Sequence, residues 1–194
     1  MSDPKGFVAL ASVLEGVGVT AYLGAAADIM SKEYLTDAGS ILTVEARHSA
    51  YIRAALGESP FPMPFDTPLD FDEVFTLAGQ FIASCPSSNP ALPVKAFPVL
   101  TLGTMGTIKS NDTITLKTPG YQLKAVDGYS PLYAAFITIL GPIFGPATPV
   151  AGGFSVMVPP GVNGQSYVVL TGCNTTVTDD TVAAGPAIVE VTNY

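Results

Sequence analysis

Apolar residues recur at helical spacing along the first part of the chain. Asp3-Pro4 is typical of a helix start, because it combines an acidic N-cap with proline at the first helical position. The apolar positions then follow at three- and four-residue steps: Phe7, Leu10, Leu14, Val17 and Ala21. This period predicts a helix. Few polar residues remain for a solvated face, so we expect other elements to surround it.

Two more helices are predicted before residue 85. A stripe of apolar residues runs through 32–56, and Gly57 directly after it is a plausible C-cap glycine. The proline-rich segment 60–68 then predicts an extended loop, and its Phe61-Pro-Met-Pro-Phe65 stretch is expected to pack across the helices or, as the alternative, to contact a partner. Residues 70–84 predict a shorter amphipathic helix.

From about residue 86 the pattern changes to short apolar runs separated by turns rich in glycine, proline and asparagine. Seven such runs recur at a spacing of roughly ten residues, which favours an immunoglobulin-like β-sandwich. They are 96–102, 113–118, 121–126, 133–140, 154–158, 167–171 and 187–192. The predicted fold class is therefore α+β with two domains: a helical half bundle over 1–85 and a β-sandwich over 86–194.

Composition narrows the function classes. Hydrophobic residues make up 48% of the chain and charged residues 12%, whereas charged residues approach a quarter of an ordinary soluble domain. We therefore expect some surface to be buried against another chain. The net charge of -8 provides no basic stripe, which argues against nucleic acid and anionic membrane surfaces as partners.

Localisation is only weakly indicated. Residues 7–30 are apolar, but Glu15 and Asp28 interrupt them, so no membrane span is expected. No signal peptide is recognised. Two glycosylation sequons, at Asn111 and Asn174, favour a secreted or cell-surface protein over a cytoplasmic one. The two cysteines, Cys85 and Cys173, fit neither a zinc site nor a redox motif, and a bridge between them stays open.

Three polar residues interrupt the apolar helical rows: Glu15, Glu45 and His48. A buried carboxylate must be neutralised, hydrogen-bonded or bound to a cation. Glu45 and His48 are three residues apart, so a helix places them on one face, where both can reach the same metal ion. Glu15, on the preceding helix, can supply another carboxylate. The alternative is that the three simply form a hydrogen-bonded network.

These residues amount to half of a known ligand set. Dinuclear metal-carboxylate bundles use one Glu from each of two helices and Glu-x-x-His from each of two others. One copy of this chain offers one Glu and one Glu-x-x-His. Two copies around a twofold axis would complete the set, and isologous dimers are the commonest oligomers. The expected cofactor is iron or manganese, which suit carboxylate and imidazole ligands.

Two segments resemble a known family. Leu14-Glu15-Gly16-Val17-Gly18-Val19-Thr20-Ala21-Tyr22-Leu23-Gly24-Ala25-Ala26 and Ile41-Leu42-Thr43-Val44-Glu45-Ala46-Arg47-His48-Ser49-Ala50-Tyr51-Ile52-Arg53 resemble the second helix pair of the ferritin-like domain in fungal stress- and desiccation-related proteins. The resemblance covers roughly residues 5–85, and the downstream β region is similar to the extension of fungal members. It implies that Glu15, Glu45 and His48 are metal ligands of one half of the bundle.

The chain departs from the family because the usual first helix pair, with its own Glu and Glu-x-x-His, is not present in it. A homodimer or a separate chain completes the bundle, or the metal site has been lost. The predicted function is a dinuclear metal-carboxylate protein in redox, oxygen or peroxide chemistry, a candidate oxidoreductase whose substrate the sequence does not identify. The alternatives are a metal-free secreted structural or interaction protein that binds through its β-sandwich and, ranked last, a protein that binds an apolar small molecule between its helices.

Overall fold

The computed structural model describes residues 3–123 and 131–193 of the chain. Helix α1 spans Pro4–Ala25, and its N-cap Asp3 accepts hydrogen bonds from the backbone N–H groups of Lys5 and Gly6. Helix α2 spans Lys32–Ala55 and ends just before Gly57. The φ of Gly57 is +80°, a conformation that suits glycine after a helix end. The start signal at Asp3-Pro4 and the stop signal at Gly57, both read from the sequence, are therefore confirmed.

The third helix is shorter than the predicted 70–84. Helix α3 spans Phe71–Ala78, and the short 3-10 helix η1 continues it over Gly79–Phe81. A reciprocal capping box holds its start, since Glu73 N–H donates to the Asp70 carboxylate and Asp70 N–H donates to the Glu73 carboxylate. The remaining residues of the predicted helix run on without regular structure.

Eight strands form two antiparallel sheets. The first sheet has the order β1-β2-β6-β5 and the second the order β4-β3-β7-β8. The strands span Thr101–Leu102 (β1), Thr113–Lys117 (β2), Tyr133–Ile137 (β3), Ile143–Pro146 (β4), Thr148–Val150 (β5), Gly153–Met157 (β6), Gly164–Thr171 (β7) and Val182–Val191 (β8). The prediction of an α+β chain, with helices first and strands afterwards, is confirmed.

The two sheets enclose the main hydrophobic core. Inward-facing residues of both sheets meet in one cluster, among them Ile114 and Leu116 of β2, Phe136 of β3, and Val168 of β7. These four side chains are at most 1% exposed. The alternating burial of β2 shows that its other face points to solvent.

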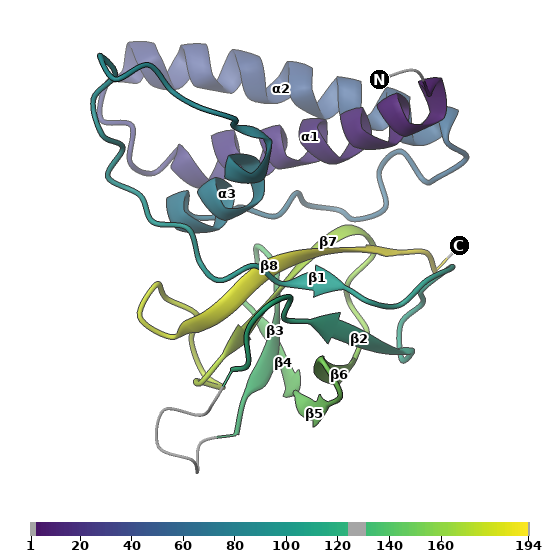
Figure 1. Cartoon of the computed structure of the whole chain (residues 1–194). Coiled ribbons are helices and arrows are strands. Elements are labelled where there is room, and N and C mark those ends of the chain that lie inside the picture. Colours follow the sequence, from purple (N-terminus) through teal and green to yellow (C-terminus); the bar gives the residue numbers. More distant parts are fainter. Residues whose placement is uncertain (1–2, 124–130, 194) are drawn as a thin grey trace.

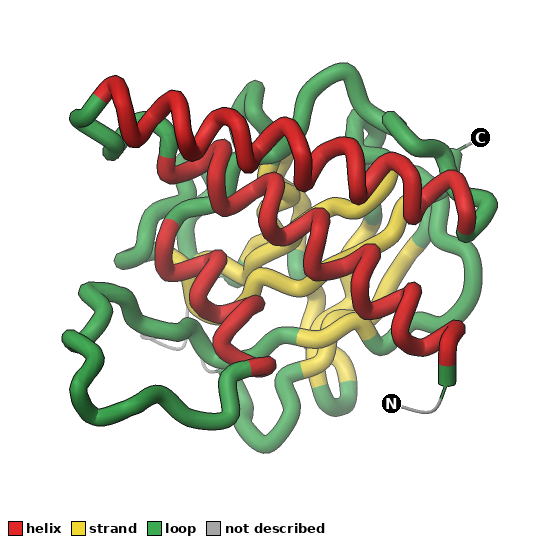
Figure 2. Tube along the Cα trace, turned by 90° about the horizontal axis from the view of Figure 1, so that it is seen from above, coloured by secondary structure: helices red, strands yellow, loops and turns green. Residues whose placement is uncertain are grey.

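The helices cover the outer face of the second sheet. Figure 1 shows α1 and α2 side by side above the sandwich, with α3 between α1 and β8, and Figure 2 shows the helices lying over the strands. A second cluster, with Val17, Leu69, Leu77 and Tyr167, fills this interface. β7 is therefore buried on both faces along nearly its whole length, with an unbroken apolar run from Tyr167 to Leu170 at its centre.

Several predicted strands differ from the observed ones. Only the last two residues of 96–102 pair as a strand, β1, and the preceding residues include Pro98, which has no N–H to donate. β4 and β5 were not predicted, because Pro146 and Pro149 indicate turns; both are edge strands, where proline is tolerated. Of the predicted strand 121–126, residues 121–123 are not a strand, and 124–126 lie outside the described residues.

Arg53 joins the helical layer to the sandwich. Its side chain is 5% exposed and donates two hydrogen bonds, of 2.7 and 3.0 Å, to the carboxylate of Glu190 on β8. It also lies 3.4 Å from Glu58 and donates to the carbonyl of Ser59. Arg53 is therefore buried despite its charge. Its planar guanidinium can satisfy several acceptors at once, which allows burial.

Candidate metal centre

The two long helices bring the predicted ligands together. Glu15 lies midway along α1, and Glu45 and His48 lie on the adjacent α2. The Nδ1 of His48 is 3.2 Å from Oε2 of Glu15. The Glu45 carboxylate also lies beside Glu15, and a Cβ placed on Gly18 would be 2.8 Å from Glu45 Oε2. The three residues thus form one cluster, here called the carboxylate cluster.

The carboxylate cluster borders a groove on the side of α1 that faces away from the sheet. The groove has a volume of about 560 Å³ and is lined by Phe7, Leu10, Ala11, Leu14, Glu15, Gly18 and Glu45. The Glu15 side chain is 24% exposed and that of His48 is 57% exposed. In one copy of the chain the cluster is therefore only partly enclosed, not buried inside a bundle.

The electrostatics of the carboxylate cluster suit a cation. Burial raises the pKa of the Glu45 carboxyl above its ordinary value, and the hydrogen bond and like charge of Glu15 raise it further. His48 opposes this rise. Two adjacent carboxylates repel each other unless a proton or a cation lies between them. The donor set of two carboxylates and one imidazole fits iron or manganese.

One copy of the chain does not hold a complete site. Within residues 3–123 and 131–193, no group of three or more His, Cys, Asp and Glu side chains is arranged to hold a metal ion. The Glu15–His48 contact engages a nitrogen and an oxygen that a metal would need, so these side chains would have to separate slightly to bind one. The structure brings the three predicted residues together without forming a closed coordination shell.

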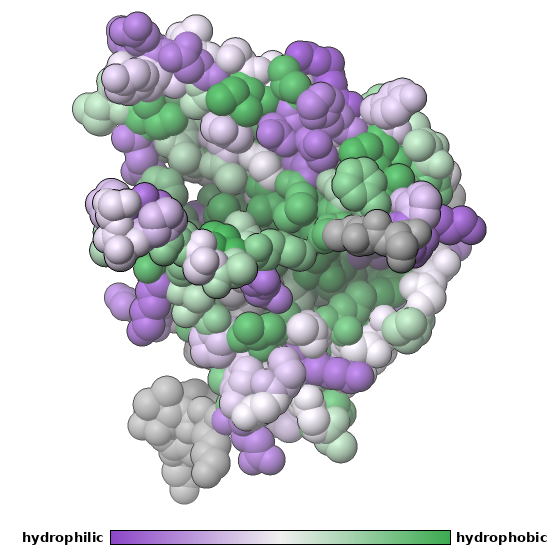
Figure 3. All heavy atoms as spheres, turned by 45° about the horizontal axis from the view of Figure 1, so that its top comes forward, coloured by the Kyte–Doolittle hydropathy of each residue, from purple (hydrophilic) through white to green (hydrophobic). Residues whose placement is uncertain are grey.

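Large apolar side chains remain exposed around the carboxylate cluster. Phe7 is 59% exposed, Leu14 39%, Ile41 40% and Val44 37%. Figure 3 shows hydrophobic side chains among hydrophilic ones over the helical layer. Such residues on paired helices are typical of a face that packs against further helices. We call these four residues the open helix face.

A second cavity lies on the opposite side of the helices, where they meet the sandwich. Its volume is about 530 Å³, and α1, α2, the 60–67 loop, β3 and β7 all contribute to its lining. The hydroxyl of Tyr167 accepts a hydrogen bond from Gln165 Nε2 and lies beside the hydroxyl of Thr20. No pattern in the sequence points to this cavity, because its lining residues come from five separate segments and have no recognisable spacing.

Three further features concern the cysteines, the length of α1 and the glycines of α1. Cys85 and Cys173 are both free thiols, so the bridge left open between them is not formed. Within the part of the chain that the structure describes, α1 is the one helix long and apolar enough to cross a membrane. Two of its glycines pack closely against other elements: Gly16 lies against Gln165 of β7, and Gly24 against the backbone of Leu69.

Comparison with known proteins agrees with the helical geometry. Residues 1–58, which include both long helices, match the model of the ferritin-like domain. The chain is 24% identical to Protein rds1 of Schizosaccharomyces pombe, over 77% of this chain and 52% of that protein. The chain thus spans about half the length of the curated relative that it matches. These two matches support the assignment of the chain to a fungal ferritin-like family, with its ferritin-like domain within residues 1–58.

Proposed function

We propose that the chain supplies half of a dinuclear iron or manganese centre, and that a second copy completes it by packing on the open helix face. The contact between Glu15 and His48, with Glu45 beside it, carries this proposal. The ferritin-like match supports it, since that superfamily often holds dinuclear metal ions bound by carboxylates.

Each residue of the carboxylate cluster has a distinct role in this proposal. Glu45 and His48, one helical turn apart, bind one metal ion from α2, and Glu15 reaches across from α1 to the same ion or to its neighbour. Two copies provide four carboxylates and two imidazoles. Gly18 leaves the space that the Glu45 carboxylate occupies. The dimer would also remove Phe7, Leu14, Ile41 and Val44 from water.

The bound metal pair would supply one-electron redox chemistry toward oxygen or peroxide. The protein's own contribution is to hold the carboxylates in place and to exclude water with the apolar residues of the groove, Phe7, Leu10 and Leu14. Excluding water strengthens the electrostatic interactions within a site. Oxygen or peroxide as the substrate is part of this proposal. A secreted or cell-surface location is proposed as well, from the sequence alone.

The proposed architecture for the C-terminal part is an immunoglobulin-like sandwich, and the strand order supports it. With the strands lettered A, B, C, C′, D, E, F and G in chain order, the two sheets read A-B-E-D and C′-C-F-G. The first order is that of one immunoglobulin sheet, and C′ beside C extends the other, as in variable-type domains. In this arrangement the sheet containing C, F and G supports the helices.

Metal content and solution mass, measured on one sample, test the proposed centre. Purification with iron and manganese present should give a dimer with two metal ions per pair of chains, as a dinuclear site requires. Glu45→Gln should lose most of the metal. Glu33→Gln is the matched control, because Glu33 is an exposed glutamate in the first turn of the same helix. A metal-free monomer from this preparation contradicts the proposal.

The alternative function is a metal-free structural or interaction protein that works through its β-sandwich. The exposure of His48 allows this reading, because a side chain that is 57% exposed can pair with Glu15 without any metal. Under the alternative, His48→Leu leaves both the stability and the activity of the protein unchanged. Under the metal proposal, the same substitution removes metal while the fold persists. Metal analysis and thermal unfolding of this variant separate the two.

A further inference from the structure

The cavity between the helices and the sandwich has a lining that suits a particular class of ligand. Its volume of about 530 Å³ lies in the usual range for small-molecule sites, which often form where structural layers meet. Its neutral polar groups include the hydroxyls of Thr20, Ser49 and Tyr167 and the side-chain amide of Gln165. Hydroxyls and amides can both donate and accept hydrogen bonds.

Charge in this cavity is largely balanced. Arg53 is paired with Glu190 and Glu58, which leaves Arg47 and Asp66, of opposite sign, as the other charged residues of the lining. No single-sign field therefore favours a strongly anionic or cationic ligand. A neutral ligand rich in hydroxyl groups is the better match.

Some hydrogen-bonding capacity in the lining is unused. Within the residues that the structure describes, no protein group is hydrogen-bonded to the partly exposed hydroxyls of Ser49 and Thr67. At the floor of the cavity, Gln165 Nε2 donates both to the Val13 carbonyl and to the Tyr167 hydroxyl, which fixes the side-chain amide in place. Fixed polar groups bind a ligand at a smaller entropic cost than mobile ones.

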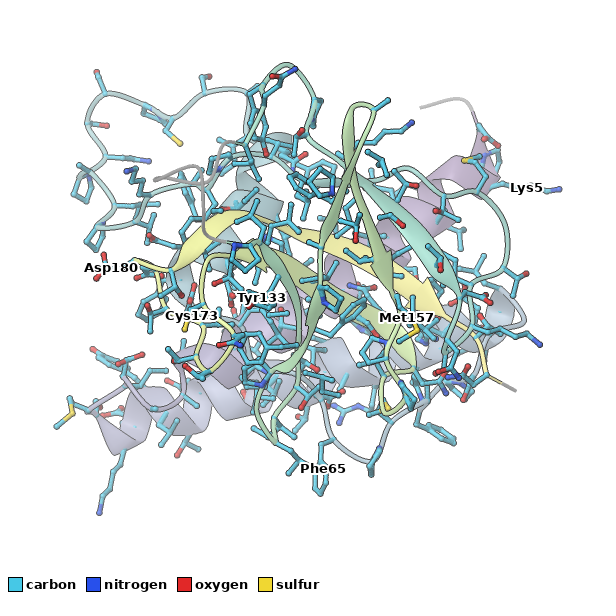
Figure 4. All side chains as sticks on the ribbon, turned by 90° about the horizontal axis from the view of Figure 1, so that it is seen from below. Lys5, Phe65, Tyr133, Met157, Cys173 and Asp180 are labelled. Carbon is cyan, nitrogen blue, oxygen red and sulfur yellow. The ribbon has the colours of Figure 1, made fainter. Side chains whose placement is uncertain are left out.

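Two phenylalanines border the same cavity. Phe61 is 78% exposed and Phe65 is 57% exposed, so their rings do not pack against the helices, although the loop itself lies beside α1 and α2. Phe65 projects from the edge of the molecule in Figure 4. Pro60, Pro62 and Pro64 alternate with other residues in the loop and restrict its backbone. The rings are therefore presented to solvent beside the cavity without a packing role.

From these features we infer that the cavity binds a neutral carbohydrate, such as one end of an oligosaccharide. A sugar ring offers C–H groups on its face, which an aromatic ring can cover. Its hydroxyl edge matches the neutral donors and acceptors of Ser49, Thr67 and Gln165. This site is separate from the carboxylate cluster, because it lies between the helices and the sheet, and it is independent of metal binding.

Ligand-detected NMR and calorimetric titration test the inference. The probes are maltose, cellobiose and N,N′-diacetylchitobiose, and sodium hexanoate represents an anionic, apolar ligand. At least one saccharide should bind with a Kd of about 10 mM or tighter, a weak affinity typical of a small contact. The inference is overturned if no saccharide binds at concentrations well above this, or if hexanoate binds in place of the sugars.

Substitutions locate the binding. The double variant Phe61→Ala/Phe65→Ala should weaken saccharide binding about tenfold, the loss expected when aromatic contacts are removed. Ser49→Ala should weaken it as well. Phe81→Ala is the matched control, because Phe81 is 54% exposed and lies outside the cavity. Equal binding by the double variant and the native chain would overturn the assignment. Metal content should be the same in all four proteins, which separates this result from the proposed metal centre.

Discussion

Gly18 shows how a missing side chain shapes the carboxylate cluster. An alanine Cβ there would lie 2.8 Å from Oε2 and 3.0 Å from the carboxyl carbon of Glu45, closer than such atoms can approach without moving. The Glu45 side chain therefore occupies space that only glycine leaves open. A helix interior normally disfavours glycine by about 1 kcal/mol relative to alanine. Gly18 therefore lowers the stability of α1 but leaves room for the Glu45 carboxylate.

Gly18→Ala should separate metal binding from stability. We expect metal affinity to fall about tenfold, because Glu45 must move, while the free energy of unfolding stays the same or rises. Gly39→Ala is the control, since Gly39 lies in α2 with no atom within 4 Å of an added Cβ. This control should gain up to about 1 kcal/mol of stability and keep its metal. Denaturant unfolding and metal titration measure both quantities, and an unchanged metal affinity in Gly18→Ala would contradict the role of this glycine.

At the scale of single elements, α3 combines a helix cap with a buried acid. Glu73 is 3% exposed and completes the capping box with Asp70. Burial raises the pKa of Glu73 to about 7, the charge of Asp70 adds to the rise, and the hydrogen bond from the Asp70 backbone opposes it. The carboxyl group of this cap is therefore protonated in mildly acidic solution, where an exposed glutamate is ionised.

The raised pKa of Glu73 predicts a pH-dependent stability. The folded value of about 7 exceeds the ordinary value of 4.5, so between these values the folded chain binds more protons than the unfolded chain. The free energy of unfolding should therefore fall as the pH rises from 4.5 to 7, by at most about 3 kcal/mol. In Glu73→Gln this contribution should disappear, whereas the exposed control Glu33→Gln should keep it. Denaturant unfolding across this pH range shows the difference, and identical profiles for Glu73→Gln and the native chain would refute the assignment.

At the scale of the whole molecule, Arg53 and Glu190 connect the helical layer to the sandwich. The pair joins α2 to β8, 137 residues apart in sequence, through two hydrogen bonds. Such a pair contributes less than its Coulomb attraction, because burying the guanidinium removes it from water. Removing one partner lowers the stability of the fold more, since the charge of the other partner then stays partly buried without an opposite charge beside it.

Arg53→Met should lower the free energy of unfolding by about 2 kcal/mol, a value reduced from that of fully buried pairs because the Glu190 side chain is 33% exposed. The double variant Arg53→Met/Glu190→Gln should recover part of this loss, because Glu190 is then no longer left as an unpaired charge and only Glu58 has lost its partner. Arg47→Met, on an exposed arginine of the same helix, should change stability by no more than about 0.5 kcal/mol. Equal losses in Arg53→Met and Arg47→Met would show that the junction does not stabilise the fold.

The sequence by itself determined the local elements and the grouping of the carboxylate cluster. Asp3-Pro4 and Gly57 marked helix ends, and the spacing of Glu45 and His48 placed both on one helical face, because these signals depend on neighbouring residues only. Short apolar runs between turn residues likewise identified strands such as β2, although proline in the edge strands β4 and β5 concealed them.

Only the tertiary structure decided how the layers meet. The burial of Arg53 depends on Glu190, far along the chain, and the cavity beside Tyr167 is assembled from helix, loop and strand. The exposure of Phe61, Phe65 and His48 also follows from which faces the sheet happens to cover. Local periodicity shows that a face is apolar or polar, but contacts between distant segments decide what lies against it.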